Sequence, residues 1–343
     1  MAGIAAHKPI HLADADPRPA FLQRWERIRH RQAHLLVELV AEFWGVFCYV
    51  YCGVGATASF ICGNALQVTN LGSFFTIGIA YAIGIIFALV VASATSGGHF
   101  NPGITLCFVL FKGFPKPKAL AYVATQIFGG MIACLLVYAQ WHDLIVETEA
   151  VMAAAGELDA IKFTANGPAG IFALYAPVGA HLGLTLLNEF VCDFFIGMVI
   201  FASTDPTNFF APPVAAPWLI GLAYAVCVWG FAPLGLSTNT ARDLGGRLAV
   251  LVIWGRDAAG GNYAALAALT NLLATPCAFI FYEIFFKDSS RVLTSGGNEM
   301  LTGHKLHQEH RIQNISGGRT AATASPDSEL GEKSYESHRE YAS

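Results

Sequence analysis

The chain has 343 residues, of which 55% are hydrophobic and only 13% are charged. Soluble globular domains carry about 25% charged residues, so this composition excludes an ordinary soluble protein. The net charge of −4 says little by itself, and the positions of the basic residues say more. We expect no nucleic-acid partner. No Asp, Glu, Lys or Arg occurs in residues 43–111 or 206–241. Because a membrane-spanning helix needs about 20 apolar residues, these stretches hold several spans and predict an integral, multi-pass membrane protein in a lipid bilayer.

The apolar segments predict six membrane-spanning helices, preceded by a polar tail over residues 1–32. We place the spans at about 34–56, 72–94, 117–140, 184–204, 213–234 and 263–286. Two further apolar segments, 101–111 and 239–253, are too short to cross a bilayer and begin at polar residues, so we expect two re-entrant half-helices. Residues 287–343 are rich in Ser, Gly, His and charge and are expected to form a disordered cytoplasmic tail.

The order of segments is the same in both halves of the chain. Repeat one, residues 33–140, and repeat two, residues 184–286, each consist of span, span, half-helix, span, and an external loop over 141–183 joins them. An odd number of spans in each half gives the halves opposite orientations in the membrane. We therefore predict an all-α membrane fold in which residues 33–286 form an inverted repeat with a transport site near the bilayer midplane.

The basic residues predict the orientation of this domain. Of the 20 Lys and Arg residues, 16 lie before residue 32, between residues 112 and 118, or from residue 287 onward. All three segments fall on one side of a six-span protein, and the connection between the first two spans has no Lys or Arg. The positive-inside rule therefore predicts that both termini are cytoplasmic.

Two asparagines stand at matching places in the repeats, each at the start of a half-helix. The motifs are Asn101-Pro102-Gly103 and Asn239-Thr240-Ala241. A helix that begins within the bilayer leaves about four unpaired N–H groups, which are costly unless water or a solute meets them. Asn is among the best N-cap residues, and two facing N-termini create a positive field that opposes cations but accepts neutral molecules. One Asn-Pro is typical of a turn; two matched Asn-led segments favour a selective pore.

These motifs resemble those of the major intrinsic proteins, the aquaporins and aquaglyceroporins, over about residues 34–286. The family motif is Asn-Pro-Ala in both halves, so the chain keeps both Asn residues and departs from the motif at Gly103 and Thr240. The family's Ser-Gly-x-His pattern is present and ends at His99, and Arg242 follows the second Asn by three positions. The departures resemble divergent fungal members. Thr at 240 lacks the preset φ of Pro, which can loosen or tilt the second half-helix without removing the Asn donor.

The resemblance also implies a narrow selectivity filter beyond the Asn pair. By offset from the two Asn residues, its positions are Tyr81, Cys227, Leu236 and Arg242. Water-selective members carry His where Cys227 stands, so the smaller Cys implies a wider opening. Arg242 would supply fixed donors and repel cations, opposite an apolar wall of Tyr81 and Leu236 that matches the carbon edge of a polyol. Asp243 also resembles the glycerol-conducting branch, although an ion pair with Arg242 is the structural alternative.

Two acids, Glu42 and Glu189, resemble the family's buried carboxylates in the first and fourth spans, which accept hydrogen bonds from the half-helix loops. A buried carboxylate without partners is strongly destabilising, so a scaffold role is our main hypothesis and a proton relay is the alternative. Asp193 lies one helical turn after Glu189 and is unusual for the family.

The resemblance implies a passive channel for small neutral solutes, glycerol and similar polyols with water also permeating, in a homotetramer in the plasma membrane. The alternatives are a proton-coupled secondary transporter and a closed pore with a scaffold or junction role. We expect no enzyme, because the chain has no HExxH or GxSxG motif, and no cofactor. We also expect no metal site, because the spacing of His304, His307 and His310 is typical of a solvated tail.

Overall fold

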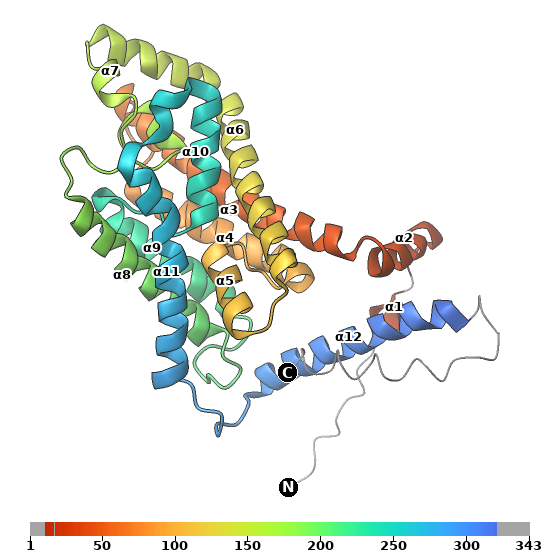
Figure 1. Ribbon diagram of the computed structural model, residues 1–343. Helices are drawn as coiled ribbons and strands as arrows, with labels where there is room; N and C mark the ends of the chain where they lie inside the picture. Colours follow the sequence, from red (N-terminus) through yellow and green to blue (C-terminus); the bar gives the residue numbers. More distant parts are fainter. Residues whose placement is uncertain (1–10, 17, 321–343) are drawn as a thin grey trace. The chain divides into compact units, whose positions relative to one another are not determined.

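The computed structural model of the chain describes residues 11–16 and 18–320. These residues divide into two compact units, a smaller one from the two ends of the described part, up to residue 37 and from residue 295, and a larger one formed by residues 38–294. Over the described residues all regular structure is helical (Figure 1). Within this part of the chain, six helices are long and apolar enough to cross a membrane. The predicted all-α membrane fold is confirmed.

The larger unit contains the six candidate spans, except for the first turn of the first span, and the two half-helices. The spans are α3 (His34–Ala65), α4 (Phe74–Ser96), α6 (Lys116–Ala154), α8 (Leu182–Ser203), α9 (Ala216–Phe231) and α11 (Gly261–Phe285). The half-helices are α5 (Pro102–Phe111) and α10 (Thr240–Trp254). The connections contain α7 (Leu158–Ile161), η1 (Pro168–Ile171), η2 (Ala232–Leu234) and η3 (Arg256–Ala259).

Each half-helix packs against the last span of the opposite half, α10 against α6 and α5 against α11. Glycine permits both contacts. A Cβ added at Gly245 of α10 would lie 2.7 Å from the backbone N of Met131 on α6. A Cβ added at Gly103 of α5 would lie 2.8 Å from the carbonyl O of Asn271 on α11. The close approach of α11 therefore explains why this chain has Gly rather than Ala at the third position of its first motif.

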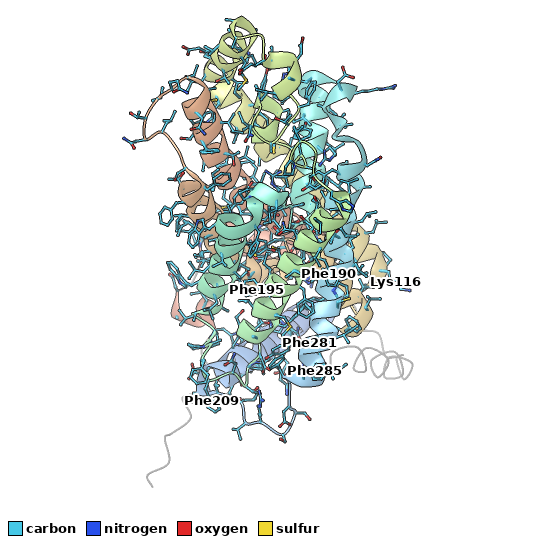
Figure 2. The ribbon with its side chains drawn as sticks, turned by 90° about the vertical axis from the view of Figure 1, so that its left-hand side faces the viewer. Lys116, Phe190, Phe195, Phe209, Phe281 and Phe285 are labelled. Carbon is cyan, nitrogen blue, oxygen red and sulfur yellow. The ribbon has the colours of Figure 1, made fainter. Side chains whose placement is uncertain are left out.

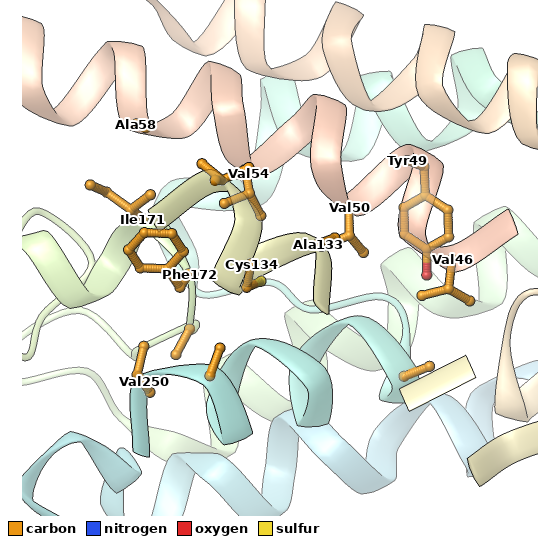
Figure 3. Close-up of a cluster of buried hydrophobic side chains, with 14 of the residues drawn as sticks. Val46, Tyr49, Val50, Val54, Ala58, Ala133, Cys134, Ile171, Phe172 and Val250 are labelled. Carbon is orange, nitrogen blue, oxygen red and sulfur yellow. The ribbon is translucent and has the colours of Figure 1, made fainter. Parts of the chain in front are cut away.

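A hydrophobic cluster joins the first half to the second around α3 (Figure 3). Val50 and Val54 of α3 belong to this cluster with Cys134 of α6, Phe172 of the α6–α8 connection and Val250 of α10. All five side chains are fully buried or nearly so. The connection between the halves is therefore part of the core, which holds its backbone against α10.

The lateral surface of the bundle is apolar, as a helix face in contact with lipid requires. Phe195 of α8 and Phe281 and Phe285 of α11 project from the bundle (Figure 2), with 43%, 40% and 66% of their surfaces exposed. A surface with several large exposed aromatic side chains is unusual on a soluble monomer. Their position on the span candidates fits a lipid environment.

Two spans are longer than the sequence analysis predicted. Helix α3 continues to Ala65 instead of about residue 56, and α6 continues to Ala154 instead of about residue 140. The segment after residue 140 is rich in helix formers and has no Gly or Pro before Gly156, so nothing ends the helix when its apolar part ends. The external connection is correspondingly shorter than 141–183.

The smaller unit contains a helix within the segment that was expected to be a disordered tail. It contains α1 (Leu12–Ala15), α2 (Ala20–Arg31) and α12 (Ser295–Thr320), and α12 packs against α2. Residues 299–309 include Glu, Met, Leu, Lys and Gln, which favour a helix, and the contact with α2 supplies tertiary support for this polar helix. Residues 321–343 lie outside the described part.

Candidate functional site

Both Asn motifs line one cavity in the larger unit. The cavity has a volume of about 510 Å³ and is lined by residues of both repeats, including Asn101, Asn239 and Arg242. Residues 164–166 and 173–178 of the α6–α8 connection line it as well. The structure therefore brings the two Asn residues, which are 138 positions apart in the chain, to one cavity.

Each Asn side chain caps its half-helix through its carbonyl oxygen. Asn101 Oδ1 accepts hydrogen bonds from the N–H groups of Gly103 at 2.7 Å and Ile104 at 3.4 Å. Asn239 Oδ1 accepts from Ala241 at 2.9 Å and Arg242 at 3.3 Å. Both Asn residues have extended backbones, with φ of −154° and −156°. The caps are equivalent, and they leave both amide NH2 groups available for other acceptors.

The two NH2 groups cross between the repeats. Asn239 Nδ2 donates to the carbonyl O of Phe100 at 2.9 Å, and Asn101 Nδ2 donates to that of Thr238 at 3.4 Å. Phe100 and Thr238 each precede an Asn and have positive φ, 47° and 60°. Such a conformation is rare for a β-branched residue, and here it turns each carbonyl toward the opposite half.

The carboxylates of Glu42 and Glu189 accept hydrogen bonds from the backbone just before each Asn. Glu42 accepts the N–H groups of His99 at 3.0 Å and Phe100 at 2.8 Å. Glu189 accepts those of Ser237 at 2.7 Å and Thr238 at 2.6 Å. Both carboxylates are 0% exposed. The hydrogen bonds expected from the family resemblance are present, and they satisfy backbone donors that no helix satisfies.

His99 supports the first motif and is also one of the residues that line the cavity. Its ring is 5% exposed, with Nδ1 3.2 Å from the hydroxyl of Thr105. The ring packs among Phe108, Phe114 and Tyr122, with centroids 4.4, 4.9 and 5.3 Å away. His99 therefore fixes the loop before Asn101 by packing.

One further contact makes the two Asn residues unequal. Asn101 Nδ2 also lies 3.4 Å from the hydroxyl of Tyr224, which lines the cavity from α9. Both amide hydrogens of Asn101 thus have protein acceptors, whereas Asn239 Nδ2 has one such partner, Phe100, among the described residues. The remaining N–H of Asn239 is the better donor toward a molecule in the cavity.

Arg242 lies toward the part of the cavity that the α6–α8 connection lines. Its Nε and Nη2 donate to the hydroxyl of Tyr81 at 3.1 and 2.9 Å, and Nη1 donates to the carbonyl O of Phe172 at 2.7 Å. Glycines make both contacts possible, because a Cβ at Gly53 would overlap the ring of Tyr81 and one at Gly246 would overlap Phe172 O. The guanidinium is therefore fixed in one orientation.

Asp243 does not pair with Arg242, so the structural alternative considered for that Arg is wrong. Asp243 forms an ion pair with Arg247, at 2.6 Å from Oδ1 to Nη2. Arg247 also donates to the carbonyls of Leu174 and Ala259. This pair ties α10 to the connections on either side and leaves the Arg242 charge to the cavity.

The α6–α8 connection is held in place by a second contact with the segment after α10. The hydroxyl of Tyr175 donates to the carbonyl O of Ala258 at 2.9 Å. Burial raises the pKa of Tyr175 to about 12, so the hydroxyl remains a donor over the physiological pH range.

The structure does not place Cys227 in the cavity lining, which corrects the filter assigned by offset. Its side chain is 1% exposed and packs with Cys192, Ile196 and Leu236. From α9, the cavity is lined by Ile220, Tyr224 and Val228, the last of which is adjacent to Cys227 in the chain. A difference of one residue turns a helix by 100°, and the 3-10 helix η2 between α9 and the second motif changes the helical phase that a fixed offset assumes. Leu236 lines the cavity as expected.

Thr240 replaces the family's Pro without loosening the second half-helix. Its hydroxyl donates to the carbonyl O of Ala268 on α11 at 2.8 Å and lies 3.4 Å from Asn271 Oδ1. Asn271 in turn donates to the carbonyl of Thr238 at 3.2 Å and to Asp193 at 3.4 Å. A side-chain bond to the neighbouring span thus takes the place of the fixed φ of Pro.

Asn271, Gln126, Tyr224 and Val228 were missed by the sequence analysis. Gln126 donates to Glu42 at 2.7 Å, and Asn271 contacts the backbone before Asn239. Polar side chains in the middle of apolar spans were the available signal for the first two residues. The sequence did not reveal which face of α9 meets the cavity, because α9 has no distinct polar face.

The comparisons with known proteins agree with this geometry. The model of the family described as "Major intrinsic protein" matches residues 29–256. The chain belongs to the major intrinsic protein family. A Laccaria bicolor protein named aquaporin-3 is 50% identical over 306 residues, covering 89% of this chain and 93% of that protein. The glycerol uptake facilitator protein of Pseudomonas aeruginosa is 32% identical over 232 residues, covering 66% and 79%.

A solved structure shows the same fold. The aquaglyceroporin from Plasmodium falciparum superposes with a TM-score of 0.62 at 20% identity, covering 73% of this chain and 96% of that chain. As a major intrinsic protein, the chain is a multi-pass membrane channel for water and small solutes and not an enzyme. No group of three potential metal-ligating side chains occurs among the residues that the structure describes.

Proposed function

We propose that the chain is a passive channel for glycerol and similar polyols through which water also passes. The observation that carries this proposal is the cavity that contains the amides of Asn101 and Asn239 together with the guanidinium of Arg242. These groups donate hydrogen bonds or carry positive charge. They attract the lone pairs of neutral hydroxyl compounds and oppose cations.

The composition of the cavity wall supports polyols as solutes. Besides Arg242 and Tyr81, the cavity lining includes the apolar side chains Leu236, Val228 and Ile220. A polyol has a hydroxyl edge and a carbon edge. The polar groups of this wall can bind the hydroxyl edge, and its apolar side chains can contact the carbon edge. Val at the α9 position, like the Cys first assigned there, is smaller than His and lacks its polar ring. The similarity to proteins named glycerol uptake facilitator and aquaglyceroporin also favours this solute class.

The proton-coupled transporter is the second candidate. Glu42 and Glu189 argue against it, because both carboxylates are used by backbone N–H groups. Asp193 keeps it testable, since its Oδ2 is buried without a hydrogen-bond partner in the described structure. A closed pore with a scaffold or junction role is the third candidate.

Stopped-flow light scattering on proteoliposomes distinguishes the three. A channel gives faster shrinkage in sucrose than empty vesicles do, and faster re-swelling in glycerol than in urea. A glycerol flux that changes with an imposed pH gradient would support the coupled transporter. Wild-type protein that gives no flux of water or glycerol, although it is fully inserted, would support the closed pore.

Three further properties are part of the proposal. We expect a homotetramer with one pore in each subunit, in the plasma membrane, with both termini cytoplasmic because of the Lys and Arg distribution. Cross-linking in native membranes tests the assembly. Protease access to residues 11–31 in intact and permeabilised cells tests the orientation.

A further inference from the structure

Helix α2, immediately before the first span, presents an apolar stripe to the surroundings. Phe21, Trp25 and Ile28 follow one another at intervals of four and three residues, so they share one face of the helix. Their side chains are 71%, 43% and 39% exposed. A surface helix normally turns such an apolar face toward a core. Here the face is exposed, so the stripe has no protein partner in the described structure.

The partner helix α12 covers a different face of α2. The half-buried positions of α2 are Leu22, Glu26, Arg29 and His30, and the rings of His30 and His307 lie 6.4 Å apart. Packing of α12 therefore leaves the stripe uncovered and fixes which way it faces within this unit.

A row of arginines runs beside the stripe. Arg24, Arg27 and Arg31 are spaced by three and four residues and are all exposed. On a helical projection this row is centred about 90° from the stripe. A helix with aromatic and aliphatic residues on one face and Arg beside them has the composition of helices that lie in the interface of an anionic membrane.

The chain itself brings α2 to a membrane surface. Helix α2 ends at Arg31, and α3, the first candidate span, begins at His34. Two residues span at most about 7 Å, so α2 cannot leave the vicinity of the bilayer from which α3 emerges. Among possible occupants of the stripe, a lipid surface is the one that is always within reach.

We propose that α2 is an anionic-lipid binding element. Phe21, Trp25 and Ile28 insert at the level of the acyl-chain boundary, and Arg24, Arg27 and Arg31 bind lipid phosphate or carboxylate groups of the leaflet next to the start of α3. The juxtamembrane arginines are then in contact with headgroups and not with bulk solvent. This site is separate from the solute cavity and independent of which solute passes.

Hydrogen exchange of the full chain in nanodiscs tests the proposal. The amides of residues 20–31 are compared in nanodiscs of phosphatidylcholine and in nanodiscs that also contain phosphatidylserine. We expect exchange to slow by roughly tenfold or more with the anionic lipid and to recover at high salt, because salt screens the Arg–headgroup attraction. This comparison changes the lipid and not the protein, so a folding defect cannot mimic the result.

Two variants with the same charge change sharpen the test. Arg24→Glu with Arg31→Glu is expected to remove the protection, while Arg256→Glu with Arg291→Glu, at exposed positions outside α2, is expected to keep it. Equal exchange in both nanodiscs would overturn the proposal. So would equal loss in the two variants, or protection that depends on the number of protein copies in each nanodisc, which would identify a second copy as the occupant.

Discussion

The two half-helices α5 and α10 share one supporting scaffold but differ in the chemistry they carry. In each, an Asn caps the helix, a residue with positive φ precedes it, and a buried Glu holds that residue's N–H. Only α10 carries charge, with Arg242 at the cavity and the ion pair of Asp243 and Arg247 beside it. Only α5 begins with Pro. The scaffold is duplicated, whereas the charged side chains are confined to the second half-helix.

The largest effect on solute flux is expected when one of the two Asn residues is replaced. Asn239→Leu removes the cap and the donor that faces the cavity, so solute flux should fall by more than roughly tenfold, since 1.4 kcal/mol of barrier corresponds to a factor of ten. Asn101→Leu should reduce flux less, because both amide hydrogens of Asn101 already have protein acceptors. Stopped-flow measurements at equal amounts of inserted protein give the ratio.

The matched control for these variants is Asn262→Leu, at an exposed position at the start of α11. It should leave flux unchanged. Unaltered flux in Asn239→Leu would count heavily against the pore assignment, and an equal loss in the two pore variants would contradict the asymmetry of the Asn pair.

A second comparison concerns neighbouring residues of α9. Val228→His places an imidazole in the cavity and should lower glycerol flux relative to water flux by several-fold, because it narrows the lining and adds a polar ring. Cys227→His should leave this ratio near that of the wild type and reduce stability by about 1–3 kcal/mol through overpacking. The glycerol-to-water ratio in proteoliposomes decides between the two positions. A shift in the ratio only for Cys227→His would restore the assignment by offset.

Replacing the two buried acids, Glu42 and Glu189, is expected to have an intermediate effect on stability. Glu42→Gln should lower stability by about 1–3 kcal/mol, because Glu42 accepts from Gln126 as well as from two N–H groups, and an amide must turn a donor toward one of them. Glu189→Gln should cost less, since Glu189 Oε1 alone can accept from both Ser237 and Thr238. Thermal unfolding in detergent measures the difference. A larger loss for Glu189→Gln would show that the two supports are not equivalent in this way.

The smallest effect is expected at Thr240, where the two motifs differ. Thr240→Pro restores the family residue at the first helical position, where Pro is well tolerated, but removes the hydroxyl bond to Ala268. The net change should stay within about 1 kcal/mol. Thr240→Ala, which loses the bond without gaining the fixed φ, should be the less stable of the two. Equal unfolding temperatures for these variants would mean that the bond, and not the backbone preference, is what matters.

Much of the fold could be predicted because it follows from hydropathy. In a bilayer every span must be an apolar helix, and a half-helix needs a good N-cap where it begins. Asn101 and Asn239 therefore indicated where the two half-helices start. The ends of α3 and α6 could not be predicted, because a helix continues past the apolar region until Gly, Pro or packing stops it. The helix α12 was missed because its stability depends on contact with α2, which no local pattern reveals.

The sequence by itself determined the six spans, the repeat, the two caps and the two buried acids, since each is a local match between side chain and membrane environment. The tertiary structure decided which face of α9 meets the cavity, that Asp243 pairs with Arg247, and that a Thr hydroxyl bonded to α11 replaces the family's Pro. These outcomes depend on helical phase and on neighbours far apart in the chain. Rotations and contacts of that kind are set only when all the helices pack together.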